Sequence, residues 1–310
     1  MQVNWDVDDF QPSKATVITL GTFDGVHQGH GRIIEKLNQA AQERDALSVL
    51  MTFEPHPQMV LASQRQPSVQ LLTCIEEKIR LLQDRNLHHL VVAQFTSQFA
   101  AIEPEDFVTN ILCRKMRMQH IVIGHDHAFG KKRRGNLQLL LDLSVKNHFT
   151  VETIEAVQNQ GDTISSTQIR QALHAGDLAK ANRLLGRCYS LSGQVIKGDQ
   201  RGRSLGFPTA NIRPCSRQKL IPRSGVYASR LAVKGQIYSS ATYIGTKPTF
   251  GINEPSIEVH IIGQNIELYQ EHAELQLCRW MREDRSFGDK RSLIEQIETD
   301  IKSIQHILNQ

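Results

Sequence analysis

The chain has 310 residues, 40% hydrophobic and 22% charged, which is the composition of an ordinary globular protein with room for two domains. No apolar run approaches the roughly 18 residues that a membrane span needs. The polar start of the chain is typical of neither a signal peptide nor a transit peptide. We therefore expect a cytoplasmic protein that makes no membrane contact.

The net charge of +4 is unevenly spread along the chain. Residues 1–186 hold 19 Lys/Arg and 20 Asp/Glu, a net of −1, whereas residues 187–310 hold 17 and 12, a net of +5. A basic half could bind nucleic acid, but its arginines are scattered and form no helical stripe, so we expect no nucleic-acid partner. The five cysteines are widely spaced without a C-x-x-C, which favours neither a disulfide framework nor a zinc site.

Apolar runs alternate with helical patterns through residues 1–186. Predicted strands cover residues 15–20, 47–53, 90–95, 120–124 and 149–154, and predicted helices cover 31–44, 75–85, 105–116 and 137–146. Such alternation predicts a parallel sheet that binds ligands beyond the carboxyl ends of its strands. Two short predicted helices, 168–175 and 178–185, follow, and Gly186 ends the second.

After residue 186 the hydrophobic pattern changes, and apolar residues recur at every second position. Runs at residues 189–196, 226–233, 237–244 and 257–262 predict an antiparallel β-barrel. A final helix over residues 290–307 has its apolar positions on one face. We therefore expect an α/β domain at residues 1–186 and a barrel domain with a C-terminal helix at residues 187–310.

The most informative motif follows the first predicted strand and reads G-T-F-D-G-V-H-Q-G-H over residues 21–30. His27 and His30 lie three apart at a helix start, so they share one face where backbone N–H groups favour anions. The pair predicts a site for nucleotide phosphates, and a capping or packing role is the alternative. No P-loop occurs in the chain.

Other polar segments of the first domain fit the same chemistry. The hydroxyl residues 165–167 stand at the start of a predicted helix, and Arg170 follows one turn later. The hydroxyls and the guanidinium either bind phosphate, or the hydroxyls only cap the helix and the arginine is solvated. His56 follows the second predicted strand and stands between two prolines that stiffen it, so it either contacts a ligand or is only a rigid loop residue. The basic segment 131–134 either binds a ligand or is solvated.

The second domain opens with G-D-Q-R-G-R-S-L-G-F-P-T-A-N over residues 198–211. Its glycines let backbone N–H groups approach phosphates. Thr209 and Asn211 are two apart, so they face one side of an extended strand, and their oxygens suit Mg²⁺ bound with ATP. An ordinary turn entering a strand is the alternative.

Together these motifs resemble the bacterial bifunctional riboflavin kinase/FAD synthetase family over about residues 15–305. The H-x-G-H segment is similar to that of the nucleotidylyltransferase superfamily. The resemblance implies a Rossmann-like nucleotidylyltransferase domain that adenylylates FMN with ATP and releases pyrophosphate. It also implies a barrel domain that phosphorylates riboflavin with ATP, and Mg²⁺ as the metal.

The resemblance also implies roles for single residues. It makes His27 and His30 catalytic in the first domain, and Glu258 in S-I-E-V-H the base of the second. It assigns nucleotide and flavin binding to Gly21, Phe23, Asp24, Gly25, His56, Asp126, Phe129, Arg133, Ser165, Ser166, Thr167, Arg170, Gly202, Arg203, Gly206, Pro208 and Thr209. It assigns the metal to Thr209 and Asn211. His127, Lys132 and Tyr243 stand where the family usually has other residues.

Two alternatives remain open on the sequence alone. One is an enzyme in which a single module works, and the other is a flavin-binding carrier or regulatory protein. Separate assays of FMN and FAD formation distinguish them. In each case we expect riboflavin, FMN, FAD and ATP as the small-molecule partners, and a monomer or weak homo-oligomer.

Overall fold

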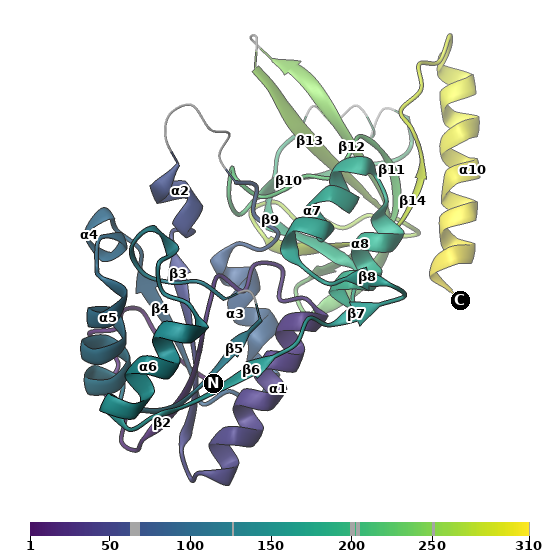
Figure 1. The fold of residues 1–310 in the computed structure, drawn as a ribbon. Helices are drawn as coiled ribbons and strands as arrows, with labels where there is room; N and C mark the ends of the chain where they lie inside the picture. The colour runs from purple at the N-terminus through teal and green to yellow at the C-terminus, as the bar shows by residue number, and fades with distance from the viewer. Residues whose placement is uncertain (63–68, 126, 199–201, 203–204, 250–251, 310) are drawn as a thin grey trace. The chain divides into compact units, whose positions relative to one another are not determined.

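The computed structural model describes residues 1–62, 69–125, 127–198, 202, 205–249 and 252–309 (Figure 1). Its contacts divide the chain into two units, Met1–Ser166 and Thr167–Gln310. This division falls before the two short helices that precede the barrel, whereas the sequence pattern suggested a boundary after Gly186. Within the described ranges, no helix combines the length and apolarity needed to cross a bilayer.

The first unit is built on a six-stranded parallel sheet with the strand order β1-β4-β3-β2-β5-β6. Its strands are β1 (Gln2–Asn4), β2 (Thr16–Leu20), β3 (Leu47–Glu54), β4 (His89–Gln94), β5 (Met118–Gly124) and β6 (Thr150–Ile154). The sheet confirms the predicted fold class. The sequence pattern missed β1, because three residues are too few to show a period.

Helices cover both faces of this sheet. One face carries α1 (Gln28–Glu43) and α3 (Ile75–Gln83), and the other carries η1 (Phe107–Lys115) and α6 (Leu137–Asn147). Alternate residues of β3 show the two sides: Leu50 joins the core under α1, while Val49 and Met51 join the core under η1. The first turn of the predicted helix at 105–116 belongs to α5 (Pro104–Asp106), and its remainder is the π-helix η1.

Short elements complete the first unit. They are α2 (Pro57–Leu61), α4 (Ser97–Ala100), the 3₁₀ turn η2 (Lys131–Arg133) and the hairpin β7 (Gln158–Asn159) with β8 (Asp162–Thr163). Several of them follow the carboxyl ends of sheet strands, the edge at which parallel sheets bind ligands.

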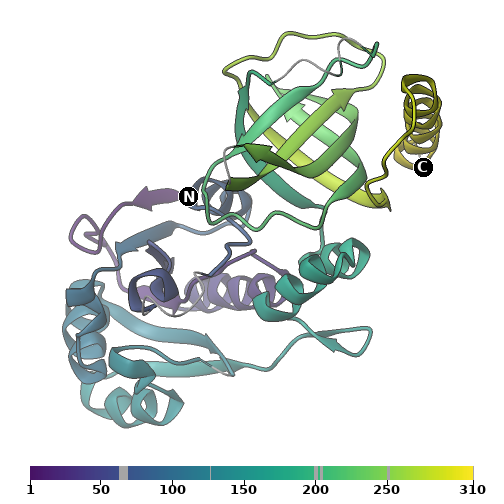
Figure 2. The ribbon, with the colours of Figure 1, turned by 90° about the horizontal axis from the view of Figure 1, so that it is seen from above.

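The second unit is a closed barrel with the strand order β10-β13-β12-β11-β14-β9 (Figure 2). The strands are β9 (Tyr189–Ile196), β10 (Ala210–Pro214), β11 (Gly225–Val233), β12 (Gln236–Thr249), β13 (Ile252–Ile261) and β14 (His272–Arg282). The helices α7 (Ser166–Ala175) and α8 (Leu178–Leu185) precede it, and α8 packs against β9 and β14. The predicted antiparallel barrel is confirmed.

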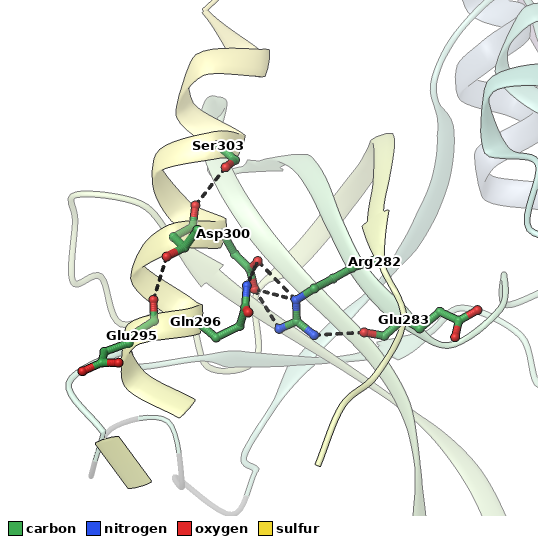
Figure 3. A network of polar contacts seen from close by, with 7 residues as sticks. Arg282, Glu283, Glu295, Gln296, Asp300 and Ser303 are labelled. Atoms are coloured by element: carbon green, nitrogen blue, oxygen red, sulfur yellow. Dashed lines mark hydrogen bonds and ion pairs between the residues drawn. The ribbon is translucent and has the colours of Figure 1, made fainter. Parts of the chain in front are cut away.

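The C-terminal helix α10 (Lys290–Leu308) packs beside β11 and β12. Its Ile304 and Leu308 form a small apolar core with Val226 and Ala228 of β11. A polar anchor adds to this contact, since Arg282 Nη2 lies 2.8 Å from Asp300 Oδ2 and both side chains are mostly buried, 15% and 11% exposed (Figure 3). The helix is therefore held to the barrel by apolar packing and by an ion pair.

Candidate active sites

The turn between β2 and α1 brings His27 and His30 together. Their rings are stacked, with centroids 3.6 Å apart and planes at 14°. His27 is buried and caps α1, because its Nδ1 accepts a hydrogen bond of 3.3 Å from the backbone N–H of His30. The ring of Phe23 lies 4.7 Å from that of His30. The capping considered from the sequence is thus present, and it also fixes the orientation of the His27 imidazole.

Asp24 shapes the same turn from inside. Its Oδ1 accepts hydrogen bonds from the backbone N–H of Thr73 (2.8 Å) and from Thr73 Oγ1 (3.1 Å), and its Oδ2 accepts one from the backbone N–H of Leu72 (3.0 Å). Gly25 has a φ of 85°, which suits glycine, and its N–H donates to Thr73 Oγ1. The carboxylate therefore holds the turn against the segment that leads into α3.

Ser166 ties a second predicted motif to this turn. Its hydroxyl donates a hydrogen bond of 2.8 Å to the carbonyl oxygen of Asp24, across 142 positions of sequence. Ser165, beside it, is half-buried. Thr167 and Arg170 belong to the second unit, so their predicted contact with phosphate stays a prediction.

Lys78 of α3 contributes to the packing around this turn, and the sequence analysis missed it. It is buried, and its ammonium donates to Thr52 Oγ1 (3.0 Å), which in turn donates to the carbonyl oxygen of Thr22 (3.1 Å). Burial lowers the pKa of Lys78, and the carboxylates of Asp24 and Glu54 partly oppose that shift. In an E-E-K segment on an amphipathic helix a lysine is usually solvated, so only tertiary packing shows this role.

His56 and the segment around residues 124–136 flank the first site. His56 is buried and caps α2, because its Nδ1 accepts from the backbone N–H of Gln58 (3.2 Å). Phe129 is buried in the sheet core, 5.9 Å from the ring of Phe107. Arg133 is exposed, and Asp126 lies outside the described residues.

Part of the basic segment 131–134 is held by an acidic side chain. Lys131 and Arg134 both form ion pairs with Glu103, and these pairs lower the pKa of that carboxyl, chiefly through the hydrogen bond from Lys131. Arg133 has a positive φ of 57° between them. This anchoring fixes the course of the backbone on either side of Arg133.

The second site forms where β10 pairs with β13. Asn211 and Glu258 are directly opposite each other in the register, and Asn211 is buried. Thr209 Oγ1 donates to Glu258 Oε2 at 3.3 Å, and Ser256 Oγ donates to Glu258 Oε1 at 3.3 Å. Residues from two motifs far apart in the sequence therefore form one cluster of a carboxylate, an amide and a hydroxyl.

Glycines allow the loop before β10 to lie close to this cluster. A Cβ on Gly198 would stand 2.0 Å from Asn211 Nδ2, and one on Gly202 would stand 2.3 Å from the carbonyl oxygen of Phe207. Gly206 has a φ of 90°. Arg203 lies outside the described residues. Gly198 and Gly202 therefore let the loop pack against this chain's own atoms, and the predicted approach of their N–H groups to phosphates stays a prediction.

Two further side chains border Glu258. The carbonyl oxygen of Pro208 lies 2.9 Å from His260 Nδ1, which joins the loop to β13. Tyr243 on β12 is opposite Glu258 in the register, and its hydroxyl donates to Asp284 (2.8 Å). Burial raises the pKa of Tyr243 to about 12, and the hydrogen bond to Asp284 adds to the shift. The tyrosine is therefore a neutral neighbour of the carboxylate.

These two sites define a class of protein. The first has imidazoles and helix-start N–H groups beyond the carboxyl end of a central parallel strand, an arrangement suited to nucleotide phosphates. The second has a carboxylate beside oxygen ligands on a barrel, which suits proton removal next to a metal-bound nucleotide. The fold and sites are those of a two-domain enzyme that transfers groups from nucleotides.

Comparisons with known proteins agree with this class. The family model described as FAD synthetase matches residues 9–168, and the one described as riboflavin kinase matches residues 185–308. Proteins named bifunctional riboflavin kinase/FMN adenylyltransferase match from Listeria monocytogenes (38% identity, 92% of this chain and 90% of the relative), Bacillus subtilis (38%, 92% and 90%) and Escherichia coli (33%, 93% and 91%).

A solved structure from Streptococcus pneumoniae matches over the whole length. It is titled a macrolide-efflux protein, and it superposes with a TM-score of 0.87 at 28% identity, covering 98% of each chain. The present chain belongs to the family of bifunctional riboflavin kinase/FMN adenylyltransferases. It is an enzyme that phosphorylates riboflavin to FMN and adenylylates FMN to FAD, with the FAD synthetase domain N-terminal and the flavokinase domain C-terminal.

Proposed function

We propose that the two reactions use separate sites, one in each domain. FMN adenylylation uses the turn with His27 and His30 in residues 1–186, and riboflavin phosphorylation uses Thr209, Asn211 and Glu258 in residues 187–310. The observation that carries this proposal is the cluster around Glu258, because the barrel alone assembles it. The stacked histidines are likewise assembled within the first unit alone.

In the first site the phosphate of FMN attacks the α-phosphorus of ATP, and pyrophosphate leaves. The work of the protein is to align the reactants and to stabilise developing negative charge. The stacked imidazoles of His27 and His30 lie at the N-terminal end of α1, where both the helix and the rings favour the transferring phosphate. Ser166, which bonds to the turn, holds the leaving pyrophosphate in this proposal, and Thr167 and Arg170 stay sequence-based candidates.

In the second site Glu258 accepts the proton of the ribityl hydroxyl of riboflavin as that oxygen attacks the γ-phosphorus of ATP. The hydrogen bonds from Thr209 and Ser256 to its two oxygens orient the carboxylate. Asn211 is opposite Glu258 on β10, and in this proposal it binds the same nucleotide. In this proposal the backbone N–H groups of the loop glycines bind its phosphates.

The donor set of the second site fits Mg²⁺. The hydroxyl of Thr209 and the amide of Asn211 are hard oxygen donors next to a carboxylate, which is the chemistry that this ion prefers. When bound with ATP it supplies charge neutralisation to the phosphates. We therefore propose a requirement for Mg²⁺. The cytoplasmic location and the monomeric or weakly oligomeric state remain predictions.

The experiment that tests the proposal separates the two reactions. His30→Ala should lower FMN adenylylation by about a hundredfold or more and leave riboflavin phosphorylation unchanged, and Glu258→Gln should do the reverse when FMN is supplied. Flavin products are resolved by chromatography after incubation with ATP and Mg²⁺. His148→Asn and Glu267→Gln, which change exposed residues, are the matched controls.

The proposal of separate sites fails if either His30→Ala or Glu258→Gln abolishes both reactions in a protein that keeps its wild-type circular dichroism. It also fails if both variants keep both activities.

A further inference from the structure

Two cysteines that take no part in either site face each other at the start of the barrel. Cys188 directly precedes β9, and Cys278 lies in β14. The register pairs Tyr189 with Leu277, and its next step places Cys188 opposite Cys278. Both cysteines carry free thiols and both are partly exposed.

The backbone holds this pair at a distance that a disulfide can bridge. Directly opposite residues of antiparallel strands have Cα atoms about 4.5–5.5 Å apart, and disulfides span about 4.4–6.8 Å between Cα atoms. Asn182 of α8 fixes both strands here, because its Nδ2 donates to the carbonyl oxygen of Leu277 (3.0 Å) and its Oδ1 accepts from the N–H of Tyr189 (2.7 Å).

The two thiols are chemically unequal. Interaction with the Cys278 side chain lowers the pKa of Cys188 and raises that of Cys278, and the Cys278 thiol donates to the carbonyl oxygen of Gln276 at 3.6 Å. The positive charge of Arg230 lowers the pKa of both thiols, so the difference between them comes from their interaction with each other. Because the thiolate is the attacking form of cysteine, Cys188 is the more reactive member of the pair.

We propose that Cys188 and Cys278 are a redox modification site that forms a reversible intramolecular disulfide with low-molecular-weight disulfides. The Cys188 thiolate attacks one sulfur of the small disulfide, and one small thiolate leaves. Cys278 then gives up its proton, and its sulfur attacks Cys188 Sγ and releases the second small thiolate. Two protein thiols are oxidised, and one small disulfide is reduced to two thiols.

The new disulfide would join the residue that precedes β9 to β14. Cys278 packs against the apolar core formed by Val226, Ala228, Ile304 and Leu308, which holds α10. A covalent link between β9 and β14 restricts the unfolded chain, so the oxidised barrel should unfold at a higher temperature than the reduced one.

The test uses the full-length protein freed of reductant and incubated with oxidised glutathione at neutral pH. Free thiols are then alkylated, and tryptic peptides are analysed by mass spectrometry. Peptide 188–197 should appear linked to peptide 235–279 with the loss of two hydrogens, and dithiothreitol should release both. Cys113 is an internal reference, because burial raises the pKa of its thiol to about 11 and it should stay largely reduced.

Variants decide between a pair and a single reactive thiol. In Cys278→Ser, Cys188 should accumulate as a stable mixed disulfide with glutathione, and in Cys188→Ser, Cys278 should react at least tenfold more slowly. The proposal is overturned if folded wild-type protein keeps both thiols, or if Cys188 ends as the mixed disulfide while Cys278 is still alkylated. A linked peptide pair that forms only after denaturation overturns it as well.

Discussion

At the scale of single residues, side chains expected to bind ligands also hold the backbone that forms the site. His27 and His56 each accept a hydrogen bond at a helix start, and Asp24 accepts three from the segment before α3. Such bonds fix the positions of the groups before a substrate arrives, which reduces the cost of ordering them on binding. Capping and ligand binding are therefore compatible roles in this turn.

Asp24→Asn tests how much the turn depends on the carboxylate. An amide offers only one acceptor oxygen, and its NH₂ group would face a backbone N–H, so the first domain should lose about 1–3 kcal/mol of stability. FMN adenylylation should fall more than riboflavin phosphorylation. Denaturant unfolding and the two flavin assays measure these effects.

Asp142→Asn is the control for this experiment, since Asp142 is exposed on α6 and bonds only to the side chain of Gln138 among the contacts recorded for the described residues. Equal stability of the Asp24→Asn and Asp142→Asn proteins would contradict the structural role given to Asp24.

His120 predicts an acid sensitivity of the first domain. It is buried beside Thr150, at 2.6 Å, and Glu152, at 3.4 Å, and burial lowers its pKa below the ordinary 6.5. The unfolded chain therefore takes up a proton at a higher pH than the folded chain. The stability is fully present above about pH 6.5 and is lost as the pH falls toward the folded pKa.

The urea midpoint of the wild-type protein should accordingly fall between pH 7 and pH 5, and that of His120→Gln should fall less. Gln keeps a partner for Thr150 but does not titrate. If both proteins lose the same stability over this range, the buried imidazole is not the cause.

At the scale of elements, the anchor of α10 can be weighed against an exposed pair on the same helix. Arg282 and Asp300 are mostly buried, and Gln296 also donates to Asp300 (2.9 Å). Asp300→Ala leaves the guanidinium without its partner, so we expect a loss of about 1–3 kcal/mol. Urea unfolding of the barrel domain measures it.

Glu295→Ala removes the ion-pair partner of Arg291, and the two side chains are 62% and 89% exposed, respectively. This substitution should change the free energy of unfolding by no more than about 0.5 kcal/mol. The comparison is matched in helix and in charge. A similar loss in both variants would show that α10 depends on its apolar face alone.

The elements that sequence could predict are those with a clear period. The central strands of the parallel sheet are mostly apolar, and the larger helices have apolar residues at helical spacing, so both were found. The sequence analysis did not find β14, although Ala273, Leu275 and Leu277 alternate inward, because Glu274 and Gln276 between them dilute the apolar signal. β10 is short and ends at Pro214, which hides it in the loop motif.

The site shows the same limit. Local motifs sufficed to predict His27, His30, Thr209, Asn211 and Glu258 as candidates, because each has a distinctive neighbourhood in the sequence. Lys78 could not be found in this way, since its importance comes from a tertiary contact with Thr52. Tyr243 stood out in the sequence only as a departure from the family pattern, and its register with Glu258 comes from the fold. Asp126 and Arg203 stay sequence-based candidates.

At the scale of the whole molecule, the two units have separate hydrophobic cores. The chain also has only two tryptophans, one in each unit: Trp5 in the first and Trp280 in β14 of the second, where Arg223 lies 4.7 Å from its ring centroid. Fluorescence can therefore report on the unfolding of each unit separately.

This leads to a prediction about how stability is divided along the chain. In a Trp280→Phe background, where Trp5 reports, Asp24→Asn should lower the denaturant midpoint and Asp300→Ala should leave it unchanged. In a Trp5→Phe background, where Trp280 reports, Asp300→Ala should lower the denaturant midpoint and Asp24→Asn should leave it unchanged. The reason is that each substitution breaks contacts inside one unit only, and distant substitutions without shared partners act independently. Measurements with a reductant present keep the cysteines out of the comparison. A single midpoint that both tryptophans report, and that both substitutions lower, would show that the domains unfold as one cooperative unit despite their separate cores.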